Sequence, residues 1–351
     1  MQNSLVRRLA GLVLLPLLAL GLAGCDDNPA GSGTPPARLA VILNSVENSL
    51  TVVPIDGAAP TALTIGLGPQ GSPVGLATRG QRAVVPLGFY PFVAVVNVPG
   101  GAVERFIPLP ANSGATGAAF LSDSIAVVGN SNLNSVTAFN VNGAVGATVA
   151  VGTFPQAIVA HQGRLYVING NLVNFSPAGP GSVTVLNAQL QVVGTVQLTG
   201  FNPSVGVVRG GRLYVLNAGH FGGNDGSLSV VDLATLQEER LVTGFGEFPG
   251  SIAVGPDGNL YAGVYGLGIL VWNPDTRTFV RGLSNPLVPG GSPPVSAVAF
   301  DVDGRLHTAN PGTCQGPGTA HRSTAAGVLE RTVATGICPF FIAFAATFPP
   351  D

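Results

Sequence analysis

A segment of one kind recurs along this chain: a proline or small residue, an apolar run of strand length, a tight polar turn and a second β-rich run. The clearest copies begin at Phe154-Pro155, Asn202-Pro203 and Phe248-Pro249. Equivalent positions lie about 45 residues apart, which is the length of one stacking unit in several repeat folds. These positions are Pro73, Thr116, Pro155, Pro203, Pro249, Pro294 and Pro339.

The period predicts an all-β protein, a seven-bladed β-propeller with four-stranded blades. Turns such as Gln162-Gly163, Gly210-Gly211 and Asp257-Gly258 use residues that tolerate positive φ, as hairpins between the first two strands require. Residues 339–348 form a first strand with no successor, and residues 38–65 form three strands with no first. We therefore expect both termini to build one composite blade, which removes open sheet edges.

Residues 1–24 have the charged, apolar and small regions of a secretory signal. The tetrapeptide Leu22-Ala-Gly-Cys25 resembles the lipobox of bacterial lipoproteins, and this resemblance implies cleavage before Cys25 and lipidation of its thiol. An ordinary signal peptide or an uncleaved anchor is the alternative. Residues 25–37 then form a lipidated cysteine with a flexible tether, and residues 38–351 form the propeller domain.

The signal implies a lipid-anchored, extracytoplasmic protein of the bacterial cell envelope, with the inner or outer membrane left open. In that oxidising compartment the two remaining cysteines, Cys314 and Cys338, are expected to form a disulfide. A metal site is the alternative, which two isolated cysteines without a Cys-x-x-Cys pair support less.

The composition excludes two classes of function. Only 9% of the residues are charged and the formal net charge is -2, without a basic run, so we expect no nucleic-acid partner. Every basic residue is arginine, which excludes a lysine nucleophile or Schiff base.

The runs Leu165–Asn169 and Leu213–Asn217 resemble the YVTN and NHL classes of propeller repeat, over roughly residues 38–348. Pro86 and Gly129 stand where the better copies have Asn169 and Asn217, which predicts an incomplete ring of equivalent polar groups.

Three long insertions between second and third strands are expected on one face of the ring, at Gly170–Gly181, Ala218–Gly226 and Pro311–Thr324. They contain the candidate ligand-binding residues Asn174, Phe175, His220, Phe221, Asp225, His321 and Arg322, beside the strand-closing Asn169, Asn217 and Asn310. This mixture suits a polar or sugar-like small molecule, a peptide or a protein. Merely solvated loops are the alternative.

Metal-dependent lactonases of related propeller folds use Asn, Asp and Glu near the axis, and that resemblance implies a cation near Asn169, Asn217 and Asn310. A hard cation needs anionic oxygens, which the corresponding positions lack. The sequence also has no Gly-x-Ser-x-Gly, His-Glu-x-x-His or Cys-x-x-Cys motif. We therefore expect a monomeric binding or scaffolding module without cofactor or metal, and a lactonase- or esterase-like hydrolase is the alternative.

Overall fold

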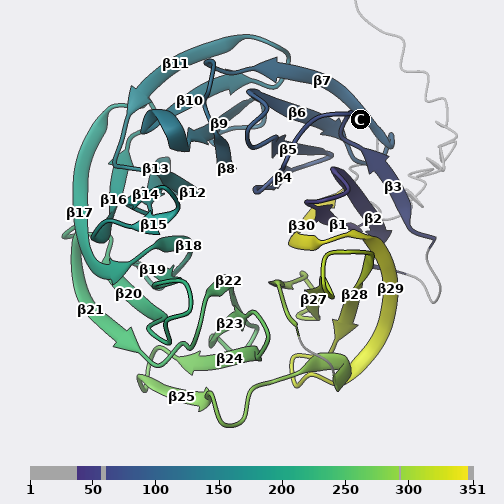
Figure 1. Ribbon diagram of the computed structural model, residues 1–351, viewed down its shortest axis with the longest axis vertical. Helices are drawn as coiled ribbons and strands as arrows, with labels where there is room; N and C mark the ends of the chain where they lie inside the picture. Colours follow the sequence, from purple (N-terminus) through teal and green to yellow (C-terminus); the bar gives the residue numbers. More distant parts are fainter. Residues whose placement is uncertain (1–37, 57–60, 292–293, 347–351) are drawn as a thin grey trace, which may run out of the picture. The chain divides into compact units, whose positions relative to one another are not determined.

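The computed structural model describes residues 38–56, 61–291 and 294–346. This described part forms seven four-stranded antiparallel sheets around a central axis (Figure 1). In each sheet the first strand lies nearest the axis and the fourth lies at the rim. The prediction of a seven-bladed β-propeller is confirmed.

Six blades follow the chain order. The first three consist of β4 (Ala77–Arg79), β5 (Arg82–Pro86), β6 (Phe92–Asn97) and β7 (Ala102–Pro108); β8 (Ala115–Phe120), β9 (Ile125–Asn130), β10 (Ser135–Asn140) and β11 (Val145–Ala150); and β12 (Pro155–His161), β13 (Arg164–Asn169), β16 (Pro180–Leu186) and β17 (Val192–Phe201). The next three consist of β18 (Pro203–Arg209), β19 (Arg212–Asn217), β20 (Ser227–Asp232) and β21 (Gln237–Thr243); β22 (Pro249–Val254), β23 (Leu260–Val264), β24 (Gly268–Asn273) and β25 (Thr278–Arg281); and β26 (Ala297–Phe300), β27 (Leu306–Asn310), β28 (Pro317–Ser323) and β29 (Leu329–Ile337).

Both ends of the described chain build the seventh blade. Its strands are β30 (Pro339–Ala346), β1 (Arg38–Asn44), β2 (Ser49–Pro54) and β3 (Leu63–Gly66). β30 pairs with β1 in antiparallel register, from Arg38 opposite Ala346 to Asn44 opposite Pro339. The expected composite blade is therefore confirmed.

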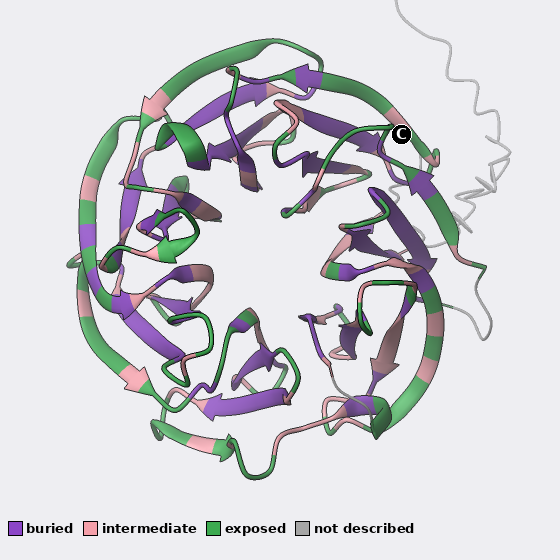
Figure 2. Cartoon of the chain, in the orientation of Figure 1, coloured by how far each residue is buried: buried purple, intermediate pink, exposed green. Residues whose placement is uncertain are grey.

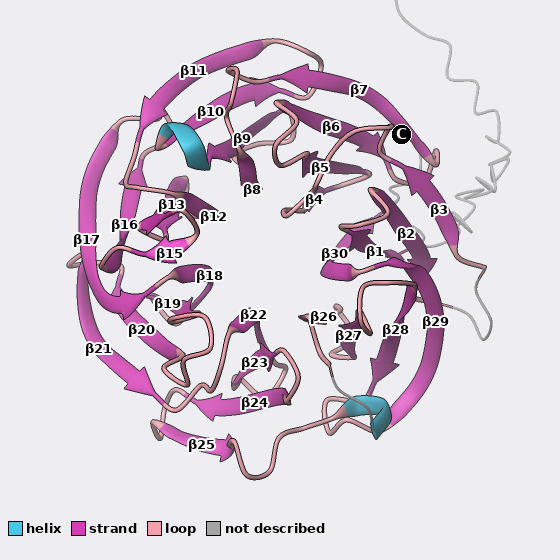
Figure 3. Ribbon diagram, in the orientation of Figure 1, coloured by secondary structure: helices cyan, strands magenta, loops and turns pink. Residues whose placement is uncertain are grey.

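Little other regular structure is present in these residues (Figure 3). A short hairpin, β14 (Leu172–Val173) and β15 (Ser176–Pro177), stands in the first long insertion, and two 3-10 turns cover Ser131–Leu133 (η1) and Pro289–Gly291 (η2).

Most middle strands of the blades are buried, whereas the outer strands are largely exposed (Figure 2). The exception is β28, in which only Gly318 and Ser323 are buried. In β13 every residue from Leu165 to Asn169 is buried, because neighbouring blades cover both faces of the sheet. Leu39 of β1 and Ala83 of β5 share one apolar cluster across two blades. The core thus consists of layers between blades, so a ring with a missing inner strand would leave two layers uncovered.

The prediction that Gly129 is equivalent to Asn169 and Asn217 is wrong by one residue, because Ala115 and not Thr116 is the marker position of that repeat. Ala115 pairs with Asn130, just as Pro155 pairs with Asn169 and Pro203 with Asn217. Asn130, rather than Gly129, is therefore the equivalent of the strand-closing asparagines.

The third insertion is also shorter than expected. Strand β28 already begins at Pro317, so the boundary at Thr324 is wrong, and His321 and Arg322 lie within a strand instead of a loop. The segment from Pro317 to Ser323 lacks the alternation of apolar and polar residues that marks a strand in a sequence.

Candidate functional site

A cavity of about 1180 Å³ follows the axis of the propeller, and residues from every blade line it. Its wall consists of the inner strands and of the loops on the face where second strands lead into third strands. The long insertions lie on this face, as the sequence predicted, because strand order places those loops beside the entry to each inner strand.

The channel wall is almost free of ionisable groups. Glu247 and Tyr265 are the only ionisable side chains among the described residues that line it. The wall includes side chains such as Val159, Val205 and Ile252. A ligand inside would therefore meet mainly apolar surface and backbone.

Several polar side chains of the wall already have partners within the protein. The Thr116 hydroxyl donates to the Pro155 carbonyl oxygen at 2.7 Å, and the Ser296 hydroxyl donates to the Pro339 carbonyl oxygen at 2.6 Å. The Gln156 side-chain amide donates to the Pro203 carbonyl oxygen at 2.8 Å. Each bond joins an inner strand to the next blade, so these groups hold the ring together and are less available to a ligand.

Phenylalanine side chains gather at the channel mouth. Phe89, Phe175 and Phe221 line the cavity with relative exposures of 68%, 66% and 89%. The rings of Phe89 and Phe175 meet edge to face with centroids 6.4 Å apart, and Phe221 meets Phe248 at 5.6 Å. Exposed apolar side chains clustered around a cavity mark binding surfaces in folded proteins.

Backbone geometry fixes two phenylalanine rings of the cavity wall, those of Phe154 and Phe248. Phe154 and Phe248 directly precede the first residue of an inner strand, with φ of 56° and 52°. Gly114, Asn202 and Cys338 occupy the same place in other blades and also have positive φ. For a bulky residue before proline this conformation is strained, so the tertiary structure must impose it.

His220 and Asp225 form a hydrogen-bonded pair within the second insertion. The His220 Nδ1 lies 2.6 Å from Asp225 Oδ2, and the ring of Phe201 packs on the imidazole at 4.8 Å. Burial opposes ionisation of Asp225, but hydrogen bonds from His220 outweigh it and hold the pKa of the carboxyl below its usual value. The pair folds the loop back on itself beside Phe221.

Asn169 and Asn217 are completely buried and do not line the channel. Their side-chain amides donate to pairs of hydroxyl groups on the adjacent third strand, at 2.9 to 3.2 Å. Asn44 and Asn130 make the same bonds in their blades. This repeated arrangement has a structural role between strands, and we leave Asn169 and Asn217 out of the proposed site.

His321 and Arg322 lie at the seam with the composite blade, away from the mouth. His321 Nδ1 is 3.3 Å from the Pro289 carbonyl oxygen, and burial lowers the pKa of its imidazole. Arg322 pairs with Glu330 at 3.1 Å and donates to the Ile55 carbonyl oxygen.

The remaining candidates lie near the mouth face but are not part of the cavity wall. Asn174 is exposed at the turn between β14 and β15, and Asn310 is half-buried, with its Oδ1 accepting from the Gly312 amide at 3.0 Å. The structure therefore brings Phe175 and Phe221 together at the channel and adds Phe89, Phe154, Phe248 and Glu247. Sequence reasoning overlooked all four, although Phe154 and Phe248 precede the prolines that mark their repeats.

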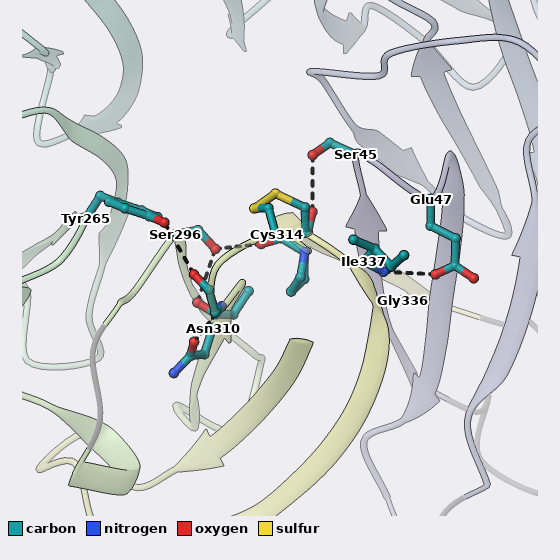
Figure 4. Close-up of a disulfide and its surroundings, with 12 residues drawn as sticks. Ser45, Glu47, Tyr265, Ser296, Asn310, Cys314, Gly336 and Ile337 are labelled. Atoms are coloured by element: carbon teal, nitrogen blue, oxygen red, sulfur yellow. Dashed lines mark hydrogen bonds between the residues drawn. A yellow bond between two sulfur atoms is a disulfide. The ribbon is translucent and has the colours of Figure 1, made fainter. Parts of the chain in front are cut away.

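A disulfide joins Cys314 to Cys338, with Cα atoms 4.5 Å apart, and confirms the expected pairing (Figure 4). The Ser45 amide donates to the Cys338 carbonyl oxygen at 2.9 Å. In the loop that carries Cys314, the Gly312 carbonyl oxygen accepts a hydrogen bond from the Tyr265 hydroxyl at 3.3 Å. The bond thus ties a mouth loop to the strand that closes the ring.

Nothing in the described residues supports the hydrolase alternative. They contain no group of three or more His, Cys, Asp or Glu side chains that could hold a metal ion. None of the helical turns in the described ranges is long and apolar enough to cross a membrane.

Comparisons with known proteins agree on the fold. No protein-family model matches the chain, and no curated protein matches it. Similar solved structures include Kuenenia stuttgartiensis hydrazine synthase, with 13% identity, 78% of this chain and 90% of that chain covered, and a TM-score of 0.63. A functionally unknown protein from Desulfotomaculum acetoxidans DSM 771 has 15% identity, with 88% and 99% covered and a TM-score of 0.65. A chain of the mitotic checkpoint complex has 17% identity, with 75% and 77% covered and a TM-score of 0.58. At these identities the likeness concerns the fold alone.

Proposed function

We propose that this chain is a lipid-anchored propeller of the bacterial cell envelope that binds an apolar or aromatic small molecule in its central channel. The observation that carries this proposal is the large, nearly uncharged cavity with exposed phenylalanines at its mouth. Its volume is sufficient for a ligand of drug size, and its lining is of the kind that binds such ligands. The proposed ligand is therefore apolar, in place of the polar or sugar-like ligand that the loop composition suggested.

The location in the envelope rests on two features. The Leu22–Cys25 tetrapeptide lies outside the described residues and resembles a lipidation signal. The disulfide between Cys314 and Cys338 is of the type that persists in oxidising compartments. We further propose that the protein acts as a monomer, since β30 closes the ring without a second copy, and that its repeats are related to the YVTN and NHL classes.

The proposal can be tested with a neutral apolar fluorophore, N-phenyl-1-naphthylamine, whose emission rises in apolar surroundings. The chain carrying Cys25→Ser, produced with an ordinary cleavable secretory signal in place of residues 1–24, is used so that neither lipid nor detergent competes for the probe. We expect saturable binding at one site per chain, weakened at least about tenfold by Phe175→Asp, because a charge at the mouth must lose its water when the probe binds.

Val302→Asp is the matched control, since Val302 is 80% exposed in a turn between first and second strands and is not part of the cavity wall. This variant should bind the fluorophore as the parent does. Absence of saturable binding to the parent, or equal effects of the two substitutions, would contradict the proposal.

A further inference from the structure

Glu247 differs from every other carboxylate in the described chain. The other described Asp and Glu side chains all have a hydrogen-bond or ion-pair partner; Asp225, for example, pairs with His220, and Glu239 pairs with Arg212. No hydrogen bond or ion pair joins Glu247 to any of the described residues, and its side chain is exposed where it lines the cavity. An unpaired carboxylate at the mouth of an otherwise nearly uncharged channel is available to a ligand.

Two aromatic rings line the same cavity as this carboxylate. Phe248 follows Glu247 directly, and its ring meets that of Phe221 at 5.6 Å with an interplanar angle of 80°. Phe221 is 89% exposed, so most of its ring surface is accessible. The faces of aromatic rings attract organic cations through their quadrupole, and a nearby carboxylate adds direct charge attraction.

The surroundings do not oppose a cation. None of the described residues that line the channel is an arginine or a histidine. The nearest imidazole along the chain, that of His220, has Asp225 as its partner at 2.6 Å. The local charge at this side of the mouth is therefore set by Glu247.

We propose that Glu247, Phe221 and Phe248 form a subsite for a substituted ammonium group whose apolar body occupies the channel. This inference rests on the proposed function of the channel and adds the charge of its ligand. Glu247 is the counter-ion, and the two rings contact the alkyl groups around the nitrogen.

The test uses benzyltrimethylammonium and its neutral carbon isostere, neopentylbenzene, as competitors of the fluorophore on the same Cys25→Ser protein. We expect the cation to compete, with an apparent Kd that rises with salt, whereas salt should affect the neutral compound much less. Glu247→Gln and Phe221→Leu should each weaken the cation about fivefold and change the neutral compound less than about twofold.

Phe106→Leu is the matched control, because Phe106 is 42% exposed on the outer strand β7 and is not part of the cavity wall. This variant should leave the cation's affinity within about twofold of the parent. If the neutral compound competes but the cation does not, or if Glu247→Gln leaves the cation's affinity unchanged, the subsite is overturned while channel binding stands. If the parent fails to bind the fluorophore at all, the proposed function itself fails.

Discussion

Removal of the disulfide between Cys314 and Cys338 should destabilise the propeller by an amount that its loop length sets. The bond closes a loop with a sequence separation of 24 residues. In the chain-entropy model such a loop restricts the unfolded chain by about 11.6 cal/mol/K, which is about 3.4 kcal/mol at 25 °C. A domain of roughly 300 residues unfolds with an entropy of about 0.6 kcal/mol/K, so Tm should fall by about 5 °C.

The assay is calorimetric unfolding of the full-length protein and of the double variant Cys314→Ser/Cys338→Ser, which leaves no lone thiol at the site. A reductant should lower the Tm of the parent by the same amount and leave the variant unchanged. A variant that melts within about 1 °C of the oxidised parent would refute the reasoning. So would two free thiols in the unfolded, unreduced parent beyond any from Cys25.

Hydrogen exchange should locate the effect of the missing bond. The loop of residues 311–316 keeps its contact with Tyr265 but loses its covalent link to the closing strand. Its amides should exchange faster in the variant, whereas amides in a distant blade such as that of β9 should not change. His321 and Arg322 should be affected less, because both lie in β28 and are paired in its sheet.

Four other changes have defined outcomes. Cys25→Ser, produced with an ordinary cleavable secretory signal in place of residues 1–24, should release the protein from membranes without unfolding it; sedimentation with membranes after salt and carbonate washes would contradict lipidation. Deletion of residues 339–351 removes the inner strand of the composite blade, so Tm should fall by many degrees; a change of only a few degrees would refute the closure. Asn130→Ala leaves two buried hydroxyls without their donor and should lower the free energy of unfolding, measured by denaturant titration, by about 1 to 3 kcal/mol; no change would show the bonds to be dispensable. His307, buried beside Asp301 with its pKa lowered mainly by burial, binds a proton more readily when unfolded. Stability should therefore fall as the pH drops below about 6.5, the ordinary histidine pKa, and His307→Gln should reduce that fall in a pH series of melting curves.

Much of the fold could be predicted from local signals. Several middle strands are buried on both faces, so they appear in the sequence as unbroken apolar runs such as Leu165–Ile168. Hairpin turns carry their own markers, and Gly163, Gly211 and Gly258 all have the positive φ that those markers imply. Where the local signal failed, at Pro317–Ser323, the strand was missed.

The candidate site was predicted only in part. Loop length indicated the face on which the insertions lie, and Phe175 and Phe221 of these insertions line the cavity. The strand-closing Asn169 and Asn217 were assigned to the site, although hydroxyls of the next strand pair with them in the core. The partners of a side chain on the neighbouring strand depend on the register between the two strands, which cannot be predicted from the sequence of one repeat.

The sequence by itself determined the architecture, the composite closure and the pairing of Cys314 with Cys338, because repeat period, turn chemistry and cysteine number are properties of the chain. Only the tertiary structure decided the chemistry of the site. It placed Phe248 beside Phe221, from two different loops, and showed that Glu247 alone among the described carboxylates has no partner. Such facts depend on distances between segments far apart in the chain, and these distances exist only once the blades have packed into a ring.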